Sequence, residues 1–286
     1  MSKILDGKTV SLSVREEIKN SVKLFKEESG IEPALAVIIV GEDPASQVYV
    51  RNKHRACAEV GIRSIMYELP AETSEQELIS IIDSLNEDSS VHGILVQLPL
   101  PSHIDDKKVI DRIRADKDVD AFHPMNVGKI MIGDFDFLPC TPAGVMQILE
   151  YYNIDVCGKH CVIIGRSNTV GKPQAMLMLH KNATVTICHS RTQGIAEITK
   201  TADILVAAVG RAGFVTADMV KDGAVVIDVG INRCPDGKLR GDVDFDAVSE
   251  KVSAITPVPG GVGPMTITML LKNTLTAAKK LSKYQK

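Results

Sequence analysis

The sequence predicts an α/β protein built of two α/β domains, the second with a Rossmann-like fold. From residue 34 onward, short apolar runs alternate with amphipathic segments, a pattern typical of parallel βαβ units. One apolar run, 161–164, ends in small, glycine-bearing residues that lead directly into a helical pattern. The length of 286 residues, with 44% hydrophobic and 24% charged residues, suits two modest domains with buried cores.

The first half of the chain predicts three strands, at 34–40, 62–69 and 91–98, each followed by a helix. The helix after the first strand has Asp43 as its N-cap, Pro44 at its first position and Gly61 beyond its end. The helix after the second strand opens on 73–76, which we interpret as a capping box. Its apolar residues form a stripe that we expect to be buried: Leu78, Ile79, Ile81, Ile82 and Leu85.

A zone rich in proline and glycine, 115–142, interrupts this alternation and marks the expected domain boundary. We place the first domain at 1–139 and the second at 140–265. The strands expected in the second domain cover 161–164, 184–188, 204–208, 225–229 and 254–256, as a doubly wound sheet requires. A loop at 257–264 then leads into a last helix, and we expect 266–286 to pack back on the first domain.

The segment after the 161–164 strand is a candidate for binding a pyrophosphate. It reads Gly165-x-Ser167-x-x-x-Gly171, which departs from G-x-G-x-x-G by one serine and one extra residue. A helix N-terminus offers unpaired N–H groups and a positive dipole end, and small residues let an anion approach them. An ordinary strand-to-helix turn is an equally good interpretation of this segment taken alone.

The turn after the next strand favours NADP over NAD. An NAD site usually places Asp or Glu there to bind the ribose hydroxyls, but residues 189–192 include no carboxylate. Arg191, with Arg166 in the first turn, can pair with a 2′-phosphate. The less favoured alternative is that Arg191 is a solvated loop cation, so NAD is not excluded.

Composition argues against several classes of function. The formal charge of −3, without a run of basic residues, gives no electrostatic footprint for nucleic acid. The polar N-terminus and the absence of a long apolar run predict a cytoplasmic protein that does not contact membranes. The six cysteines lack the spacing of metal ligands, so we expect free thiols and no metal.

Polar residues near the strand ends of the first domain are candidates for catalysis, because ligands of open α/β sheets bind outside the carboxyl ends of the strands. Tyr49 and Lys53 are spaced i, i+4 and share one face of a helix. Gln97 ends an apolar strand, and Asp120 and His123 lie in the loop that follows. Each residue alone also fits a structural role, and we expect His123 to be structural.

Taken together, these segments resemble the bifunctional methylenetetrahydrofolate dehydrogenase/methenyltetrahydrofolate cyclohydrolase family over nearly the full chain. Six motifs match in order: 49–53 (YVRNK), 75–78 (EQEL) with 93–100 (GILVQLPL), 117–120 (KDVD), 139–142 (PCTP), 165–173 (GRSNTVGKP) and 259–266 (PGGVGPMT). One departure is Ala121, where the family usually has glycine. The added methyl group would restrict the loop that carries Asp120.

The resemblance implies two successive reactions on one-carbon tetrahydrofolates. A hydride would leave 5,10-methylenetetrahydrofolate for NADP, and water would then open the resulting 5,10-methenyl cation to 10-formyltetrahydrofolate. It also implies a homodimer with a place in one-carbon metabolism and purine biosynthesis. The alternatives are a dehydrogenase without the hydrolytic step, which Lys53 and Gln97 argue against, and a non-catalytic NADP-sensing module, which leaves these residues unexplained.

The resemblance also implies roles for individual residues of the first domain. Lys53 would act as base or proton shuttle, because desolvation and a cationic substrate favour its neutral amine, and Gln97 would orient it. Tyr49 would stack on the pterin, and Asp120 would accept hydrogen bonds from pterin N–H groups. We expect this aromatic and amine pair to face the nicotinamide.

The second domain would supply a wall against the folate ring and the cofactor site. The wall would consist of Val258, Pro259, Gly260 and Gly261, where glycines allow close approach and prolines fix the flanks. The residues expected to bind the cofactor are Gly165, Arg166, Ser167, Val170, Gly171, Pro173, Ser190, Arg191, Thr192 and Ile231.

Overall fold

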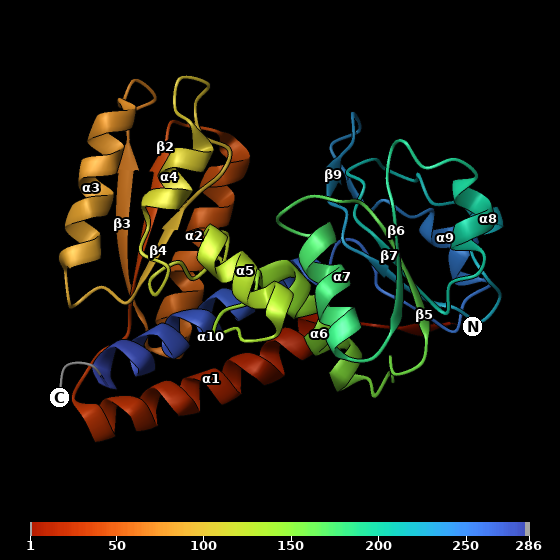
Figure 1. Cartoon of the computed structure of the whole chain (residues 1–286), viewed down its shortest axis with the longest axis horizontal. Coiled ribbons are helices and arrows are strands. Elements are labelled where there is room, and N and C mark those ends of the chain that lie inside the picture. The colour runs from red at the N-terminus through yellow and green to blue at the C-terminus, as the bar shows by residue number, and fades with distance from the viewer. Residues whose placement is uncertain (1, 284–286) are drawn as a thin grey trace. The chain divides into compact units, whose positions relative to one another are not determined.

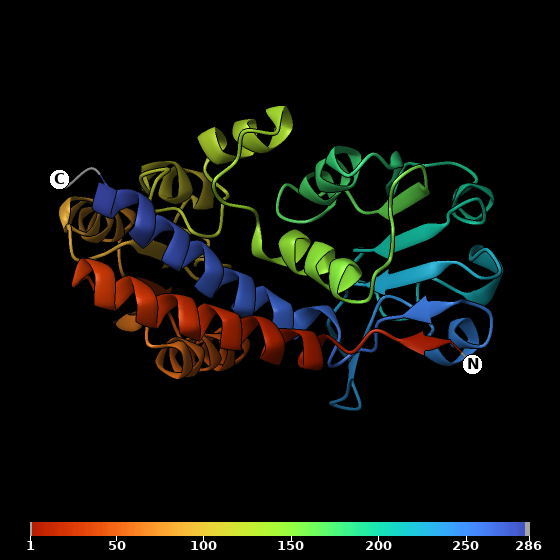
Figure 2. The ribbon, with the colours of Figure 1, turned by 90° about the horizontal axis from the view of Figure 1, so that it is seen from below.

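The computed structural model describes residues 2–283, which form two compact units. Residues 13–138 and 267–283 make up the N-terminal unit, and residues 2–12 and 139–266 make up the C-terminal unit. Helices α1 (Gly7–Ser29) and α10 (Val262–Lys283) each begin in the C-terminal unit and continue in the N-terminal unit, where they lie side by side (Figures 1 and 2). The sequence placed residues 1–12 in the first domain. The described part of this segment, residues 2–12, belongs instead to the C-terminal unit, because β1 (Lys3–Ile4) pairs with β11 (Ala254–Ile255) there.

Within the described residues, the N-terminal unit contains a parallel sheet of three strands in the order β3-β2-β4. The strands are β2 (Ala34–Val40), β3 (Arg63–Leu69) and β4 (Gly93–Val96), and β2 is buried along its whole length. Alternate side chains of the sheet pack against α3 (Glu75–Glu87) and α4 (Asp106–Arg112), while α2 (Pro44–Val60) packs on β2 and β3 (Figure 1). The terminal helix α10 belongs to this unit from Ile267 onward, as the sequence predicted.

The helix signals in the sequence correspond to observed caps. The carboxylate of Asp43 accepts the N–H of Ser46 at the start of α2, and Gly61 ends that helix at φ 82°. The capping box of α3 consists of Ser74 and Glu77, one residue later than the segment 73–76 that the pattern predicted. The register differs because the hydroxyl of Ser74, and not that of its neighbour, accepts the N–H group three residues on.

The zone expected to be loops contains helix α5 (Pro124–Ile132), before α6 (Cys140–Tyr151) begins. His123 is the N-cap of α5, since its Nδ1 accepts the N–H of Met125 at 3.1 Å. Gly133, at φ 79°, ends the helix. His123 therefore has the structural role that the sequence predicted, while the helix itself was missed because prolines and glycines at its ends resemble a loop composition.

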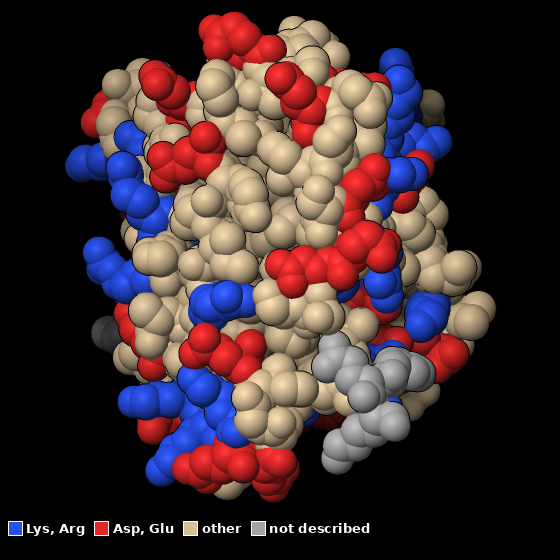
Figure 3. Space-filling view, turned by 90° about the vertical axis from the view of Figure 1, so that its left-hand side faces the viewer, with Lys and Arg blue, Asp and Glu red and all other residues tan. Residues whose placement is uncertain are grey.

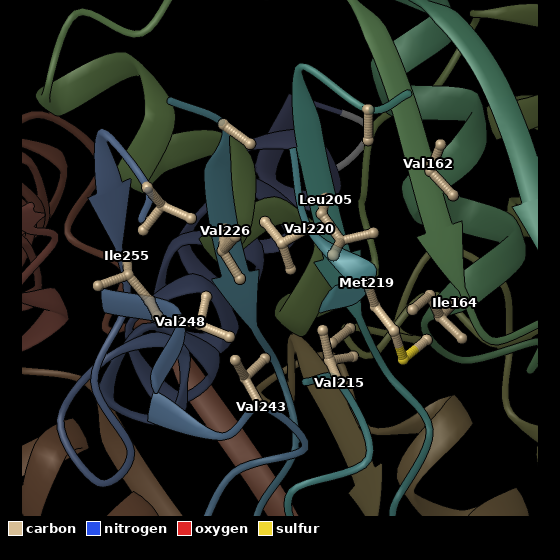
Figure 4. Close-up of a cluster of buried hydrophobic side chains, with 14 of the residues drawn as sticks. Val162, Ile164, Leu205, Val215, Met219, Val220, Val226, Val243, Val248 and Ile255 are labelled. Carbon is tan, nitrogen blue, oxygen red and sulfur yellow. The ribbon is translucent and has the colours of Figure 1, made fainter. Parts of the chain in front are cut away.

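The sheet of the C-terminal unit has six parallel strands in the described part of the chain, in the order β1-β11-β8-β7-β5-β6. Its inner strands are β5 (His160–Ile164), β7 (Ile204–Ala207), β8 (Val225–Asp228) and β11, and its edges are β6 (Thr184–Cys188) and β1. Figure 4 shows apolar side chains of the sheet, among them Val162, Leu205 and Val226, gathered against side chains from the segments that cover it. These segments include α8 (Ile195–Thr199), the short helix η1 (Ala217–Met219) and α9 (Phe245–Ser249). The doubly wound architecture is confirmed.

The strand order of this sheet reverses at β5. The chain passes from β5 through α7 (Gly171–His180) to β6 on one side, and then crosses to β7 on the other side. In the sheet register, Ile164 lies opposite both Cys188 and Ala207, so the loops after these strands leave at one edge. Ligands of open α/β sheets bind outside the carboxyl ends at such a switch point.

Charges of both signs are interspersed on the face of the molecule shown in Figure 3. Ion pairs between Lys108 and Glu75 and between Arg112 and Asp83 join α4 to α3. That face has no continuous basic surface of the kind that nucleic acid requires. Over the residues described, no helix combines the length and the apolar character needed to cross a bilayer.

Candidate active site

The N-terminal unit brings two of the predicted catalytic residues together. Lys53 lies on α2 and Gln97 directly follows β4, and the distance from Lys53 Nζ to Gln97 Oε1 is 3.0 Å. The orientation of Gln97 is fixed because its backbone N–H donates to Ile38 O and its amide Nε2 donates to Leu98 O. Lys53 is 8% exposed, so its amine is largely removed from water and has a polar partner. This arrangement can hold an amine in one direction for proton transfer.

Tyr49 lies one turn before Lys53 on the same helix. Its side chain is 39% exposed, although it is large and mostly apolar. An aromatic ring with this exposure can stack on a flat heterocycle. The position of Tyr49 is therefore compatible with the predicted contact to the pterin.

The loop that carries Asp120 is held by a buried carboxylate. Asp118 Oδ2 accepts the N–H of His123 and the Nδ2 group of Asn126, both at 2.8 Å. Burial raises the pKa of Asp118 to about 6, and the nearby charge of Asp120 acts in the same direction. The sequence motif drew attention to Asp120, whereas Asp118 is the residue that fixes the backbone around it.

Residues far away in the sequence hold the same loop. Nδ2 of Asn273, on α10, donates to Val119 O at 2.8 Å and to Leu138 O at 2.9 Å. The ammonium of Lys117 donates to the carbonyl of Leu85, in the last turn of α3, and to that of Asp88, which follows the helix. No local sequence signal indicates the role of Asn273, because its partner Val119 lies 154 residues away in the chain.

Ala121, the departure from the family pattern, has an uncommon backbone conformation. Its φ is 60°, in the left-handed region where glycine is favoured, and its side chain is fully buried. Its N–H donates to Asp118 O at 3.2 Å. The loop therefore keeps the conformation that glycine would adopt, with strain at one residue.

Two glycines of the predicted pyrophosphate turn are required by close backbone contacts. A Cβ at Gly165 would lie 2.3 Å from Ala208 O, in the loop after β7, and Gly165 has φ 131°. A Cβ at Gly171 would lie 2.3 Å from Gly165 O. The turn thus offers bare backbone at the switch point of the sheet, which fits the approach of a dinucleotide.

The N-terminus of α7 differs from the expectation in one respect. The hydroxyl of Ser167 accepts the N–H groups of Val170 and Gly171, and its carbonyl accepts that of Lys172. These three N–H groups are therefore paired within the turn, by the hydroxyl and the carbonyl of Ser167. Val170 is the N-cap and Pro173 is buried in the first turn, whereas Ser167 is exposed and its own hydroxyl hydrogen can be donated to a phosphate.

The turn after β6 is closed by its own residues. Thr192 Oγ1 accepts the N–H of His189 at 2.9 Å, and the N–H of Thr192 donates to His189 O at 2.8 Å. Ser190 and Arg191 are exposed at the tip of this turn. Within residues 2–283, no ion pair involves Arg191 or the likewise exposed Arg166. Arg191 lies in this turn, which has no carboxylate among residues 189–192, and Arg166 lies in the turn after β5. Two guanidinium groups of this kind fit a 2′-phosphate.

The loop predicted to form a wall packs tightly within the C-terminal unit. Gly260 has φ 110°, and its carbonyl accepts the N–H of Lys8 at 3.1 Å. A Cβ at Gly261 would lie 2.5 Å from Pro257 O. These contacts make the glycines structurally necessary, while Pro259 is exposed at the surface of the loop. Val258 is half-buried, and Ile231, another predicted contact residue, is 44% exposed.

Four of the described cysteines are buried, and burial raises the pKa of three of them, Cys57, Cys161 and Cys188. Burial raises the pKa of Cys57, one turn after Lys53, and that of Cys161 to about 12. These thiols are therefore poor nucleophiles near neutral pH. In the part of the chain that is described, no group of three or more His, Cys, Asp or Glu side chains is placed to hold a metal ion.

Comparison with known proteins connects both units to one family. Residues 5–120 match the catalytic domain of tetrahydrofolate dehydrogenase/cyclohydrolase, and residues 139–282 match its NAD(P)-binding domain. The chain is 61% identical over 279 residues to "Bifunctional protein FolD" of Moorella thermoacetica, which covers 98% of this chain and 99% of the relative. The crystal structure of the bifunctional FolD methylenetetrahydrofolate dehydrogenase/cyclohydrolase from Campylobacter jejuni matches with a TM-score of 0.95 at 51% identity, covering 98% and 99% of the chains. The Trypanosoma brucei enzyme, solved with NADP cofactor and an inhibitor, matches with a TM-score of 0.93 at 41% identity over 98% of each chain.

Proposed function

The chain belongs to the tetrahydrofolate dehydrogenase/cyclohydrolase family, and on that premise we propose the residues that carry out its two reactions. It is a bifunctional enzyme that oxidises 5,10-methylenetetrahydrofolate with NADP and hydrolyses the 5,10-methenyl product to 10-formyltetrahydrofolate. The observation that carries our residue assignment is the hydrogen bond of 3.0 Å between Lys53 and Gln97 in a largely buried setting.

In the first step, the protein's task is to bind and orient. NADP accepts the hydride of the methylene carbon, while a neighbouring nitrogen lone pair supplies the electrons that form the methenyl double bond. Gly165 and Gly171 admit the pyrophosphate to the backbone, and Arg166 and Arg191 pair with the 2′-phosphate. The remaining cofactor contacts come from Ser167, Val170, Pro173, Ser190, Thr192 and Ile231. Since this step needs little acid or base, alignment of the reacting carbons accounts for most of the catalysis.

In the second step, protons must move, and we assign this task to Lys53. Water adds to the methenyl carbon and passes one proton to the Lys53 amine, which releases it to solvent, giving a neutral carbinolamine. The hydroxyl proton of that species then moves to the ring nitrogen as its carbon–nitrogen bond breaks, leaving the formyl group. Gln97 orients the amine, Tyr49 stacks on the pterin and Asp120 accepts pterin N–H groups.

Replacement of Lys53 tests this assignment. Lys53→Met keeps the length and apolar stem of the side chain but removes the amine, so cyclohydrolase activity should fall by about 100-fold or more. The measurement is the decay of methenyltetrahydrofolate absorbance, with Lys107→Met, an exposed substitution on α4, as the matched control. A Lys53→Met enzyme that hydrolyses the methenyl substrate at the wild-type rate would remove Lys53 from the mechanism.

We also propose that the loop of Val258, Pro259, Gly260 and Gly261 contacts the folate. Gly260 is unsuitable for a test, because its φ of 110° makes any side chain there strained. Val258 is half-buried, so Val258→Ala shortens a side chain of the same loop and keeps its prolines and glycines. A rise in KM for the folate substrate, with unchanged KM for NADP, supports the contact, and unchanged KM for both opposes it.

The assembly and location of the enzyme are further proposals based on the family. We propose a cytoplasmic homodimer. Since one chain has a mass of 30.9 kDa, analytical ultracentrifugation should give about twice that value. A sedimenting species with the mass of one chain would contradict the dimer, and cell fractionation tests the location.

A further inference from the structure

One fully buried carboxylate in the C-terminal unit gathers four N–H groups. Asp242 Oδ2 accepts the backbone N–H of Val209 at 2.5 Å and that of Gly210 at 3.0 Å. Its Oδ1 accepts the N–H of Arg211 and the Nδ2 group of Asn232, both at 2.9 Å. Three consecutive residues after β7 and one residue of strand β9 (Asn232–Arg233) are thus bound to a single side chain.

A second buried carboxylate locks Asp242 in place. Asp228, the last residue of β8, accepts the N–H groups of Asp242 and Val243 at 2.9 Å and that of Gly230 at 3.0 Å. A Cβ at Gly230 would lie 2.2 Å from the carboxylate of Asp242, and one at Gly241 would lie 1.8 Å from that of Asp228. The carboxylate of Asp242 therefore requires glycine at position 230, and the carboxylate of Asp228 requires glycine at position 241.

These bonds lie at the carboxyl edge of the sheet. Ala207 and Asp228 are opposite one another in the register of β7 and β8, and the loops that Asp242 binds follow directly after these residues. The loop after β7 also contacts the pyrophosphate turn, since a Cβ at Gly165 would lie 2.3 Å from Ala208 O. Ile231, a proposed cofactor contact, directly precedes Asn232.

From this geometry we propose that Asp242 is a positioning residue for NADP. It holds the loop of Val209, Gly210 and Arg211, and the chain at Ile231 and Asn232, in the conformation that receives the cofactor. A carboxylate can satisfy four converging donors, whereas an amide at this position would place its own N–H groups against some of them. The inference rests on the cofactor site proposed above and adds a residue that does not itself touch the cofactor.

The test compares the NADP-dependent dehydrogenase activity of a variant with its cyclohydrolase activity, which needs no cofactor. Asp242→Asn should raise KM for NADP about tenfold or more, because loop misplacement is costly for cofactor alignment. KM for methylenetetrahydrofolate should change less than about twofold, and hydrolysis of methenyltetrahydrofolate, assayed without cofactor, should persist. The matched control is Asp203→Asn at the amino end of the same sheet, where the carboxylate accepts the N–H of His160 and pairs with Lys221, and where KM for NADP should stay unchanged.

Two further variants make each outcome decisive. Asn232→Ala removes one of the four donors, and its moderate rise in KM for NADP with intact hydrolysis supports the inference even if Asp242→Asn fails to fold. Unchanged KM for NADP in Asn232→Ala and in folded Asp242→Asn overturns it. Arg191→Ser separates the two proposals: if that variant alone raises KM for NADP, the cofactor site stands and the role of Asp242 is wrong.

Discussion

Ala121 shows how a residue with a Cβ can occupy a left-handed backbone position in a buried loop. Its left-handed conformation, with φ 60°, costs roughly 1–2 kcal/mol relative to ordinary backbone for a residue with a Cβ. The surrounding bonds of Asp118 and Asn273 fix the backbone on either side. The loop geometry around Asp120 is therefore set by its neighbours, and Ala121 accommodates it.

A larger side chain at this position should not be accommodated. We expect Ala121→Val to lower the free energy of unfolding by about 2 kcal/mol or more, because a β-branched residue is unfavourable at positive φ and the site is fully buried. Ala121→Gly is the control and should change stability by less than about 1 kcal/mol, since relief of strain is offset by the lost methyl group. Urea unfolding measures both, and equal stability of the two variants would contradict the strain.

Helix α10 has a second task besides packing. It supplies Asn273, which is 6% exposed and bonds the backbone of the Asp120 loop and of the segment before α6. Two backbone carbonyls far apart in the sequence thus depend on one amide from the end of the chain. The last helix therefore holds the loop that carries Asp120, the residue that we propose as a folate contact.

Removal of this amide should affect stability and substrate binding together. Asn273→Ala leaves two carbonyls without their donor, which should lower the free energy of unfolding by about 2–3 kcal/mol. It should also raise KM for the folate substrate. Thr276→Ala on the same helix, where the hydroxyl bonds only its own helix at Lys272 O, is the control and should change stability by less than about 0.5 kcal/mol. Equal effects of the two substitutions would show that Asn273 holds no loop.

For the protein as a whole, acid stability depends on buried groups whose pKa values are shifted in opposite directions. Burial lowers the pKa of His92 to about 4; it is 2% exposed and its Nδ1 accepts the N–H of Ala34. The stability that neutral His92 contributes is complete above its unfolded pKa of about 6.5 and is lost as pH falls towards 4. Burial raises the pKa of Asp118 and Asp228 to about 6, so their contribution is complete below the unfolded value and is lost as pH rises through 6.

A variant of His92 separates these opposing effects. His92→Asn keeps an acceptor for the N–H of Ala34 but has no titrating ring. Between pH 7 and pH 5 the wild-type protein should lose about 2 kcal/mol of unfolding free energy relative to the variant. Asp118 and Asp228 are present in both proteins, so their contributions to the pH dependence of the unfolding free energy cancel when the two proteins are compared. Urea unfolding at the two pH values measures it, and parallel pH profiles would disprove the role of His92.

Much of the fold and part of the site follow from short-range patterns. The strands and the caps Asp43 and Gly61 are predictable because hydrophobic periodicity and turn chemistry act within a few residues. The preference for NADP was also predictable, because it depends on the absence of a carboxylate among four neighbouring residues, 189–192. The helical spacing of Tyr49 and Lys53 predicted a shared face, which the geometry of α2 provides.

The sequence by itself therefore determined the α/β class, most strands of the two parallel sheets and the residue types available for catalysis, because backbone conformation depends on neighbours in the chain. Strand β1 was not predicted. Tertiary structure decided the pairing of Lys53 with Gln97, 44 residues apart, and the burial of Asp118 and Asp242. It also assigned Asn273 to a loop 154 residues away. The physical reason is that a buried polar group must find a partner, and packing between distant segments, rather than spacing along the chain, determines which partner lies within reach.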